Sequence, residues 1–319
     1  MDCSNNDISI RHLVIAGGGL TGLSYYGALR ESNLRGEWSL NNIRTIYGCS
    51  FGAFLSVLVA LDYNWDYIDD YLIKRPWHNV FKYDIYSLFE SITNKGFFTI
   101  STFETVMTPL LLGKCMEPNI TLGEFYRDTQ IEIHIFTTDV HTFQEIDLSY
   151  KTHPEWRIVD AIYASCAIPI IFAPLKQGDS YYYDGAFFSN YPVKECVENG
   201  ANPLEILGIC GLFHKTDKQT ICSESTMLDC LTVLLGNIMH TMLERKYEDG
   251  PSQEYLVETT TLTLSSMYKT ALDKNERSRL IEIGSDLVRA KYKEDTCTTL
   301  LTDSSLSVID TPELNHSTL

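Results

Sequence analysis

The chain has 319 residues, of which 44% are hydrophobic and 21% are charged, a balance typical of a folded globular protein with a sizeable buried core. Its formal net charge is −17, with 42 acidic against 25 basic residues. Because contacts to nucleic-acid phosphates need clustered Lys and Arg, this charge argues against a nucleic-acid binder. Any peripheral membrane contact would have to be apolar and local, or use a small basic patch that the summed charge conceals.

The first sixty residues alternate short apolar runs with glycine turns. Residues 1–10 are expected to be an N-terminal extension, and residues 11–16 to form a buried strand that ends at three consecutive glycines. A helical pattern follows, then a second strand over residues 43–47 and a further helical run. The predicted order is therefore strand, glycine turn, helix, strand, sharp turn, helix.

The rest of the chain is predicted to complete one domain over residues 11–292. Residues 62–130 are rich in aromatic and polar residues and are expected to form a helical insertion, or cap, that covers the sheet. Residues 293–319 are Ser/Thr-rich and weakly periodic, so they are expected to be a flexible C-terminal tail. The other predicted elements are strands at 131–137, 143–148, 181–183 and 204–210, a helix from 156 that Pro169 ends, and helices at 226–246 and 274–293.

The cysteines and the N-terminal residues bear on the compartment. Nine cysteines form no C-x-x-C pair and no spacing suited to zinc, so we expect reduced thiols and no metal site. The start of the chain lacks the basic-then-apolar layout of a signal peptide, and no uninterrupted apolar run approaches the roughly 18 residues of a membrane span. A cytoplasmic protein, peripheral at membranes at most, is therefore expected, and the sequence identifies no protein activator.

Residues 48–52 read Gly-Cys-Ser-Phe-Gly between a predicted strand and a predicted helix. This is the G-x-S-x-G pattern of a nucleophile elbow, in which a strained turn presents the central serine above the sheet and the flanking residues must be small. Alone, the pattern also fits a plain small-residue turn. In this context we predict Ser50 as a nucleophile supported by Gly48 and Gly52, while Cys49, the rival nucleophile, is expected to point away from the cleft.

The sequence GGGLTG directly follows the first predicted strand. The backbone N–H groups of Gly17, Gly18 and Gly19 are unobstructed by side chains and suit an oxyanion. The same glycines, ending at Gly22, also satisfy the dinucleotide-binding pattern G-x-G-x-x-G. That pattern expects an acidic residue closing the second strand to hold a ribose, whereas Glu37 precedes the second strand. We therefore expect no cofactor.

Asp184 and Gly185 follow a predicted aromatic strand. Asp-Gly is a common turn signal, and in isolation it indicates only a turn. Beside a serine nucleophile it gains a second meaning, because an aspartate in a partly desolvated cleft can have its pKa raised enough to accept the hydroxyl proton. We therefore predict Asp184 as the base, with Gly185 supporting its turn.

Histidine is the usual alternative base of a serine hydrolase. His214, just after the predicted strand at 204–210, is the best histidine candidate for a triad in the order Ser, acid, His. A typical α/β-hydrolase places several strands before its elbow, whereas one strand and one helix precede the Ser50 strand here, which argues against that triad. His240 lies within a predicted amphipathic helix and is expected to be a packed or surface residue.

The three motifs GGGLTG, GCSFG and DGA, in that order, resemble the patatin-like phospholipase family. The match continues between them, since ASCAIPIIFAP at 164–174 is similar to the family's small-residue and proline segment. DGAFFSNYPV also resembles its DG-x-x-x-N-x-P continuation, with Asn190 and Pro192 in place. The resemblance covers residues 11–210 well and the remainder weakly.

This resemblance implies a three-layer α/β/α sandwich with a central mixed, mainly parallel sheet, and a catalytic domain over residues 11–292. It implies a catalytic dyad of Ser50 and Asp184, an acyl-enzyme on the serine, an oxyanion hole from the glycine turn, and no metal or cofactor in the chemistry. The implied activity is phospholipase A-type hydrolysis of fatty-acyl esters in membrane phospholipids or acylglycerols. The insertion and the helix at 226–246 are candidates for an acyl-chain groove or a lid.

Two positions depart from the family pattern. Thr21 stands where the family usually has Arg or Lys, which removes one positive charge near the oxyanion turn, and Phe51 stands where smaller or hydroxyl residues are frequent. Three alternatives stay open: an acyltransferase that uses the same dyad, a catalytically silent lipid- or protein-binding module of the same fold, and a nucleotide-binding protein.

Overall fold

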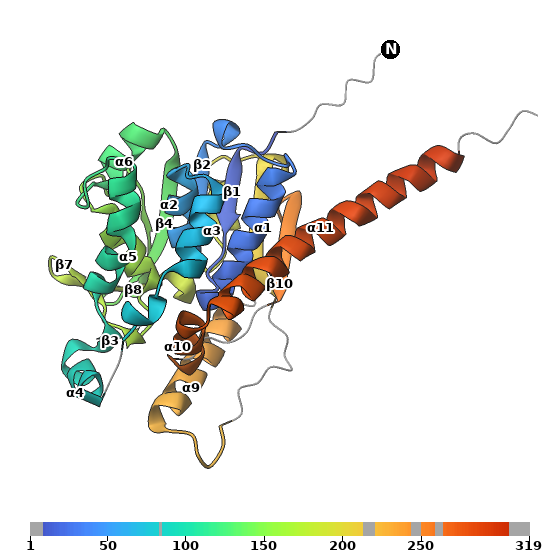
Figure 1. The fold of residues 1–319 in the computed structure, drawn as a ribbon. Coiled ribbons are helices and arrows are strands. Elements are labelled where there is room, and N and C mark those ends of the chain that lie inside the picture. The colour runs from blue at the N-terminus through green and yellow to red at the C-terminus, as the bar shows by residue number, and fades with distance from the viewer. Residues whose placement is uncertain (1–8, 83–84, 213–220, 244–249, 259–263, 306–319) are drawn as a thin grey trace, which may run out of the picture.

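An eight-stranded sheet forms the centre of the molecule in the computed structural model, which describes residues 9–82, 85–212, 221–243, 250–258 and 264–305 (Figure 1). Strands β10, β9, β1, β2 and β4 are parallel, whereas β8, β7 and β5 run antiparallel to their neighbours. The order is β10 (Gln253–Glu258), β9 (Ile206–Leu212), β1 (His12–Ile15), β2 (Thr45–Cys49), β4 (Glu132–Asp139), β8 (Ser180–Asp184) and β7 (Leu175–Gln177), with β5 (Gln144–Leu148) also pairing with β4.

Alternating side chains along the strands enter two apolar clusters, one on each face of the sheet. Leu13 and Ile15 of β1 belong to the larger cluster, whereas Val14 belongs to the smaller one. The same alternation separates Ile46 from Tyr47 on β2, because successive side chains of a strand point to opposite faces. Helices pack on both faces, so the predicted α/β sandwich with a mixed, mainly parallel sheet is confirmed.

The opening strand–helix–strand unit brings two loops to one edge of the sheet. α1 (Gly22–Leu34) connects β1 to β2, and α2 (Phe51–Ala60) follows β2 directly. The parallel register pairs Ile15 with Gly48, so both strands end at the same level. The glycine turn after β1 and the Ser50 turn after β2 therefore lie together at the carboxyl edge of the parallel strands.

Strand β4 links the Ser50 turn to the end of β8. Cys49, the last residue of β2, pairs with Phe136 of β4, and the next residue of β4, Thr137, pairs with Asp184. Because β8 runs antiparallel to β4, it descends from the carboxyl edge and ends at Asp184. β2 and β8 both pair with the edge of β4 opposite β5, and their ends meet at neighbouring β4 residues, which brings the Ser50 turn close to Asp184.

In the described part of the predicted insertion at 62–130, the regular elements are helices and one short strand. It contains α3 (Trp65–Lys74), α4 (Ile85–Asn94), α5 (Ile100–Gly113), α6 (Leu122–Thr129) and β3 (Gly96–Phe98). β3 pairs in parallel with β6 (Ile170–Phe172) to form a separate two-stranded sheet that the sequence did not predict. The described helices include none that is long and apolar enough to cross a membrane.

Three helices form the described C-terminal part of the chain, and the last of them extends beyond its predicted end. These are α9 (Met227–Leu243), α10 (Leu264–Leu272) and α11 (Lys274–Ser305). They come after α7 (Ile158–Cys166) and α8 (Val193–Glu198) in the chain. α11 packs closely on α1, since a Cβ at Gly284 would lie 1.8 Å from the carbonyl O of Ser24.

The expectation of a flexible tail from residue 293 is wrong for residues 293–305, which are helical. No glycine or proline interrupts the chain between Gly284 and Pro312, and a Ser/Thr-rich composition weakens a helix without ending it. Residues 306–319 and most of the predicted N-terminal extension, residues 1–8, lie outside the described ranges.

Candidate active site

Ser50 occupies the turn between β2 and α2 in a strained backbone conformation. Its φ of 53° and ψ of −126° are rare for a non-glycine residue, and such a conformation costs on the order of 1–3 kcal/mol. A Cβ at Gly48 would lie 2.5 Å from the carbonyl O of Gly52, and a Cβ at Gly52 would lie 2.2 Å from that of Ile15. The predicted sharp turn is present, and its flanking glycines are sterically required.

The Ser50 backbone is anchored by Ser165 of α7. The Ser165 hydroxyl accepts a hydrogen bond from the Ser50 N–H at 2.8 Å and donates one to the carbonyl O of Phe136 at 2.6 Å. Because Ser165 is fully buried, these bonds replace those it would make with water. Sequence reasoning found this residue only as part of the small-residue segment 164–174, because no local pattern reveals a partner 115 positions away.

Asp184 ends β8 and is fully buried. Its Oδ1 accepts a hydrogen bond from the N–H of Ala186 at 2.9 Å and lies 3.7 Å from Sγ of Cys49. Its Oδ2 has no hydrogen-bond partner among the described residues. Burial raises the pKa of Asp184 to about 6, although the Ala186 N–H and the Ser50 and Cys49 side chains act in the opposite direction. The carboxylate is therefore a stronger base than an exposed aspartate, with one oxygen free.

The glycine turn lies against the Ser50 turn. Gly17 donates its N–H to the carbonyl O of Asn190 at 2.9 Å, and Nδ2 of Asn190 donates to the carbonyl O of Gly17 at 3.1 Å. A Cβ at Gly17 would lie 3.0 Å from Cβ of Ser50. The N–H groups of Gly18 and Gly19 have no hydrogen-bond partner in the described part of the chain. Of the three N–H groups predicted to hold an oxyanion, two are thus available and that of Gly17 is engaged.

The remaining predicted glycines allow close packing around these turns. A Cβ at Gly22 would lie 2.0 Å from Cδ1 of Phe51, so the Phe51 ring packs directly on the end of the glycine turn. A Cβ at Gly185 would lie 2.2 Å from the carbonyl O of Phe136, which brings the segment after β8 close to β4. Thr21, where a basic residue is usual in the resembled family, is buried.

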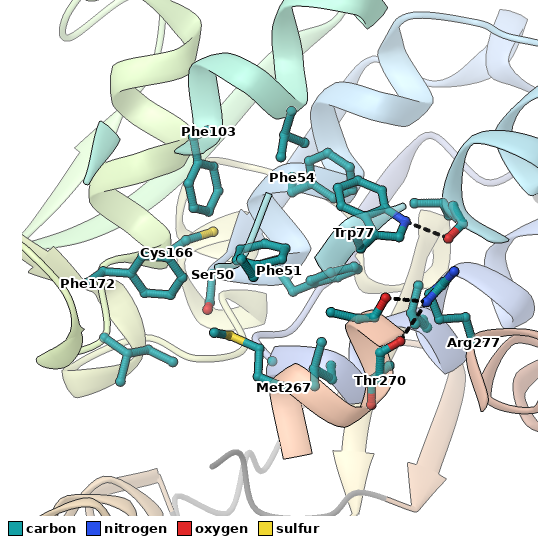
Figure 2. Close-up of a pocket in the computed structure, with 18 residues that line it drawn as sticks. Ser50, Phe51, Phe54, Trp77, Phe103, Cys166, Phe172, Met267, Thr270 and Arg277 are labelled. Atoms are coloured by element: carbon teal, nitrogen blue, oxygen red, sulfur yellow. Dashed lines mark hydrogen bonds between the residues drawn. The ribbon is translucent and has the colours of Figure 1, made fainter. Parts of the chain in front are cut away.

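An apolar cavity opens beside Ser50 (Figure 2). Figure 2 shows Ser50 and Cys166 on one side of it and Arg277 on the other. The buried Arg277 guanidinium donates to the carbonyl O atoms of Thr270 and Ala271 at 2.7 and 2.8 Å, so backbone dipoles offset its charge. Much of the wall is aromatic: Phe51, Phe54, Trp77, Phe81, Phe103 and Phe172.

The predicted groove elements contribute unequally to this cavity. Leu72, Trp77 and Phe103 come from the insertion, as expected. Met267 of α10 and Arg277 of α11 complete the wall, although the sequence did not predict α10 at all. No described residue of α9 is part of the wall.

Two cysteines flank the serine and the aspartate. Burial raises the pKa of Cys49 and of Cys166 well above the usual thiol value, and the Asp184 carboxylate raises both further. Such thiols stay protonated at neutral pH and are poor nucleophiles. Cys49 is also absent from the cavity wall, in agreement with the prediction that it points away from the cleft.

The other groups weighed from the sequence do not join this cluster. His214 and the side chain of His240 lie outside the described residues. Glu37 accepts a hydrogen bond from the Tyr255 hydroxyl of β10 at 2.7 Å. Within the described ranges, no group of three or more His, Cys, Asp or Glu side chains is arranged to hold a metal ion.

Comparison with known proteins gives a consistent set of relatives. A family model described as patatin-like phospholipase matches residues 13–197. A probable lipid hydrolase of Invertebrate iridescent virus 6 is 28% identical over 58% of this chain and 63% of its own length. An uncharacterized protein of Acanthamoeba polyphaga mimivirus is 24% identical over 59% of this chain and 62% of its own length. The chain thus spans just under two thirds of these two relatives.

Similar solved structures cover more of the chain at lower identity. VipD from Legionella pneumophila is 15% identical, with a TM-score of 0.48, over 86% of this chain and 67% of its own. Human GIVD cytosolic phospholipase A2 is 12% identical, with a TM-score of 0.43, over 90% of this chain and 58% of its own.

Proposed function

The chain belongs to the patatin-like phospholipase family, and from this premise we propose that it is a lipid acyl hydrolase that cleaves fatty-acyl esters of phospholipids or acylglycerols. The observation that carries the proposal is the buried Asp184 carboxylate, whose Oδ2 is unpartnered beside a strained serine turn. An unsatisfied buried carboxylate and a strained backbone are both costly, and they concentrate at functional sites. Here they occur together.

The proposed reaction begins with proton transfer between the two residues. Oδ2 of Asp184 accepts the proton of the Ser50 hydroxyl while Oγ attacks the ester carbonyl carbon. The C–O bond of the tetrahedral intermediate then breaks, the leaving alcohol takes the proton from Asp184, and the acyl group stays on Ser50. Water then attacks the acyl carbon while Asp184 takes its proton, the bond from the acyl carbon to Oγ of Ser50 breaks, and Oγ takes the proton from Asp184 as the fatty acid leaves. With a pKa of about 6, the carboxylate is ionised at neutral pH and still basic enough to act.

The glycine turn is proposed to hold the negative oxygen of the intermediate. The N–H groups of Gly18 and Gly19 are free to donate, and removing one such donor typically costs about 2.7–4 kcal/mol of transition-state stabilisation. Gly17 and Asn190 have a positioning role instead, because their two mutual hydrogen bonds fix the turn against the Ser50 loop. The proposed oxyanion hole therefore has two backbone donors, Gly18 and Gly19, instead of the three expected from the sequence.

The apolar cavity supports an acyl chain as the recognised part of the substrate. Its aromatic and aliphatic wall begins at Ser50 and offers little hydrogen bonding beyond it, which suits a hydrocarbon chain and disfavours a sugar or a nucleotide. The charge of Arg277 is held by backbone carbonyls, so it does not demand an anionic ligand. The fatty-acyl part is thus proposed to lie in the cavity with its ester carbonyl at Ser50.

Release of fatty acid from phosphatidylcholine–detergent micelles, in chelator and without added calcium, tests the proposal. The native chain is expected to be active, Ser50→Ala to lose activity by on the order of 10³-fold or more, and Cys49→Ala to stay within severalfold of native. Cys49→Ala is the matched control, because it removes the neighbouring nucleophile. A native chain inactive on phospholipids, acylglycerols and simple esters would contradict the proposal.

A further inference from the structure

Helix α9 presents one continuous apolar face to solvent. Met227, Leu231, Leu234 and Ile238 are 44–79% exposed. Their spacing of four, three and four residues places them on one side of an α-helix. Exposed apolar side chains are ordinary when scattered, but an aligned row on one helix face marks an interaction surface.

Helix α4 repeats this feature with aromatic and β-branched residues. Phe89 and Ile92 are 68% and 80% exposed, and their spacing of three residues puts them on the same helix face. α4 and α9 both lie at the lower end of the molecule in Figure 1. The chain enters β1 from the upper end, so this lower end is the one toward which the parallel strands run.

Both helices are attached to elements of the active site. α9 contacts the 3₁₀ helix η4 (Gly185–Phe187), which directly follows Asp184. α4 contacts β3, and β3 pairs with β6, which carries Phe172 of the cavity wall. The two apolar faces therefore lie on elements next to the base on one side and next to the acyl cavity on the other.

The low charge of α4 and α9 favours a neutral lipid surface over an anionic one. Between Met227 and Leu243 the sequence has one charged residue, Asp229, and between Ile85 and Asn94 it has one, Glu90. Neither helix contains Lys or Arg, and the whole chain has a net charge of −17. A surface of this kind gains nothing electrostatically from anionic lipid, whereas burial of its apolar residues in the headgroup–acyl boundary of a neutral bilayer is favourable.

We propose that the outward faces of α4 and α9 dock the chain on a zwitterionic phospholipid bilayer and bring the cavity beside Ser50 to the lipid surface. This inference rests on the proposed function, because a lipid substrate is the reason to favour a bilayer over a protein partner. The surface consists of Phe89, Ile92, Met227, Leu231, Leu234 and Ile238.

Flotation with phosphatidylcholine vesicles tests the surface, using the full chain with Ser50→Ala so that the vesicles remain intact. Leu234→Asp/Ile238→Asp is expected to weaken vesicle binding at least about tenfold, and Ile92→Asp to weaken it by a smaller factor. Leu34→Asp and Leu204→Asp are matched controls, because these leucines are 65% and 50% exposed near the opposite edge of the sheet. Unchanged binding in the α9 variant, or an equal loss in the controls, would overturn the proposal.

A second measurement separates docking from chemistry. With Ser50 intact, the α4 and α9 variants are expected to hydrolyse a monomeric short-chain ester at the native rate and to lose activity on phosphatidylcholine vesicles. A native chain that hydrolyses the ester but does not bind these vesicles refutes docking alone, whereas vesicle binding without any hydrolysis refutes the proposed function alone. Two outcomes would overturn the proposed bilayer. Salt-sensitive binding to anionic vesicles only would indicate an anionic lipid surface, and a native dimer that the α9 variant converts to monomer would indicate a second copy of the chain.

Discussion

Two ionisable clusters adjoin β4, one around His134 and one around Asp184, and they differ in how the central side chain is bonded. Both ring nitrogens of His134 have partners, although Oδ1 of its neighbour Asp147 has none among the described residues. His134 is buried, with Nδ1 2.7 Å from Oδ2 of Asp147 and Nε2 3.0 Å from Oε1 of Glu132. Its ring also stacks on Tyr47, with centroids 4.2 Å apart. Asp184 is buried as deeply, yet its Oδ2 has no partner among the described residues.

The difference shows how to separate structural from reactive groups. Both pKa values are raised, but for opposite reasons. Burial alone lowers the pKa of His134, and hydrogen bonds to Asp147 and Glu132 outweigh it. Burial raises the pKa of Asp184, and no cation among the described residues offsets this effect. A histidine with both ring nitrogens bonded has little left to offer a substrate, whereas a carboxylate with a free oxygen does.

Replacing each group in turn should produce the largest contrast. Asp184→Asn is expected to lower kcat by on the order of 10⁴-fold, because an amide cannot accept the Ser50 proton. His134→Gln should leave kcat within about threefold of native, since the site contains no atom of that cluster. Fatty-acid release measures both variants, and circular dichroism checks that each is folded. Activity that survives in Asp184→Asn would redirect the search for the base to His214.

The pH dependence of the native enzyme should follow Asp184. The base must be ionised to accept a proton, so kcat/KM should be flat above the pKa of about 6 and fall tenfold for each pH unit below it. At pH 4 the rate should be roughly 100-fold below its plateau. His134→Gln should show the same pH profile of kcat/KM on a neutral ester. A shift in the apparent pKa of this profile would show that the two clusters are coupled.

Replacing Asp184 and replacing His134 should change the free energy of unfolding in opposite directions. The folded-state pKa of Asp184, about 6, exceeds the unfolded value of 3.8, so the folded state holds the proton more tightly and stability falls as pH rises from about 4 to 6. The net cost of keeping the buried carboxylate ionised is about 3 kcal/mol, and Asp184→Asn should recover part of it at pH 7. Urea unfolding at pH 4 and pH 7 measures the change, and a less stable Asp184→Asn at pH 7 would contradict it.

His134 stabilises the fold in its charged form, and this contribution is also lost as pH rises, over a higher range than for Asp184. Its folded-state pKa is raised, so its contribution is fully present below the unfolded value of 6.5 and is lost as pH rises through the folded value. His134→Gln should lower the free energy of unfolding at pH 6 by about 1–3 kcal/mol, because buried carboxylate oxygens lose a charged partner. Urea unfolding should show a smaller loss at pH 9 than at pH 6, and an equal loss at both would indicate packing rather than charge.

The sequence revealed Ser50 and Asp184 because each stands in a short motif whose glycines are sterically required. It did not reveal Ser165 or Arg277, because their partners are distant in the chain and are brought near by strand order and helix packing. For the same reason, the sequence did not show that the Gly17 N–H is unavailable to an oxyanion, because it donates to the carbonyl O of Asn190, 173 positions away. The sequence indicates no role for His134, since Asp147 becomes its neighbour only when β4 and β5 pair.

The sequence did not predict the shortest strands, for a different reason. β3, β6 and β7 have three residues each, too few for an alternating pattern to be distinguished from a loop. The tail was misjudged on composition, although its sequence contains no helix breaker before Pro312. Local motifs therefore located the turns that carry Ser50 and Asp184, while the supporting contacts needed the three-dimensional structure.

The smallest expected effect lies at the exposed rim of the His134 cluster. Lys151 places its Nζ 2.7 and 2.9 Å from the two carboxylate oxygens of Glu132, but its side chain is 58% exposed, and such ion pairs contribute about 0–1 kcal/mol. Lys151→Met should therefore change stability by less than about 1 kcal/mol and leave kcat unchanged. Because Glu132 then loses one cation, the pKa of His134 should rise further, which NMR titration of its ring would measure. A fall in kcat instead would show that the two clusters are coupled through β4 and that full hydrogen bonding does not isolate a buried ionisable group from the reaction.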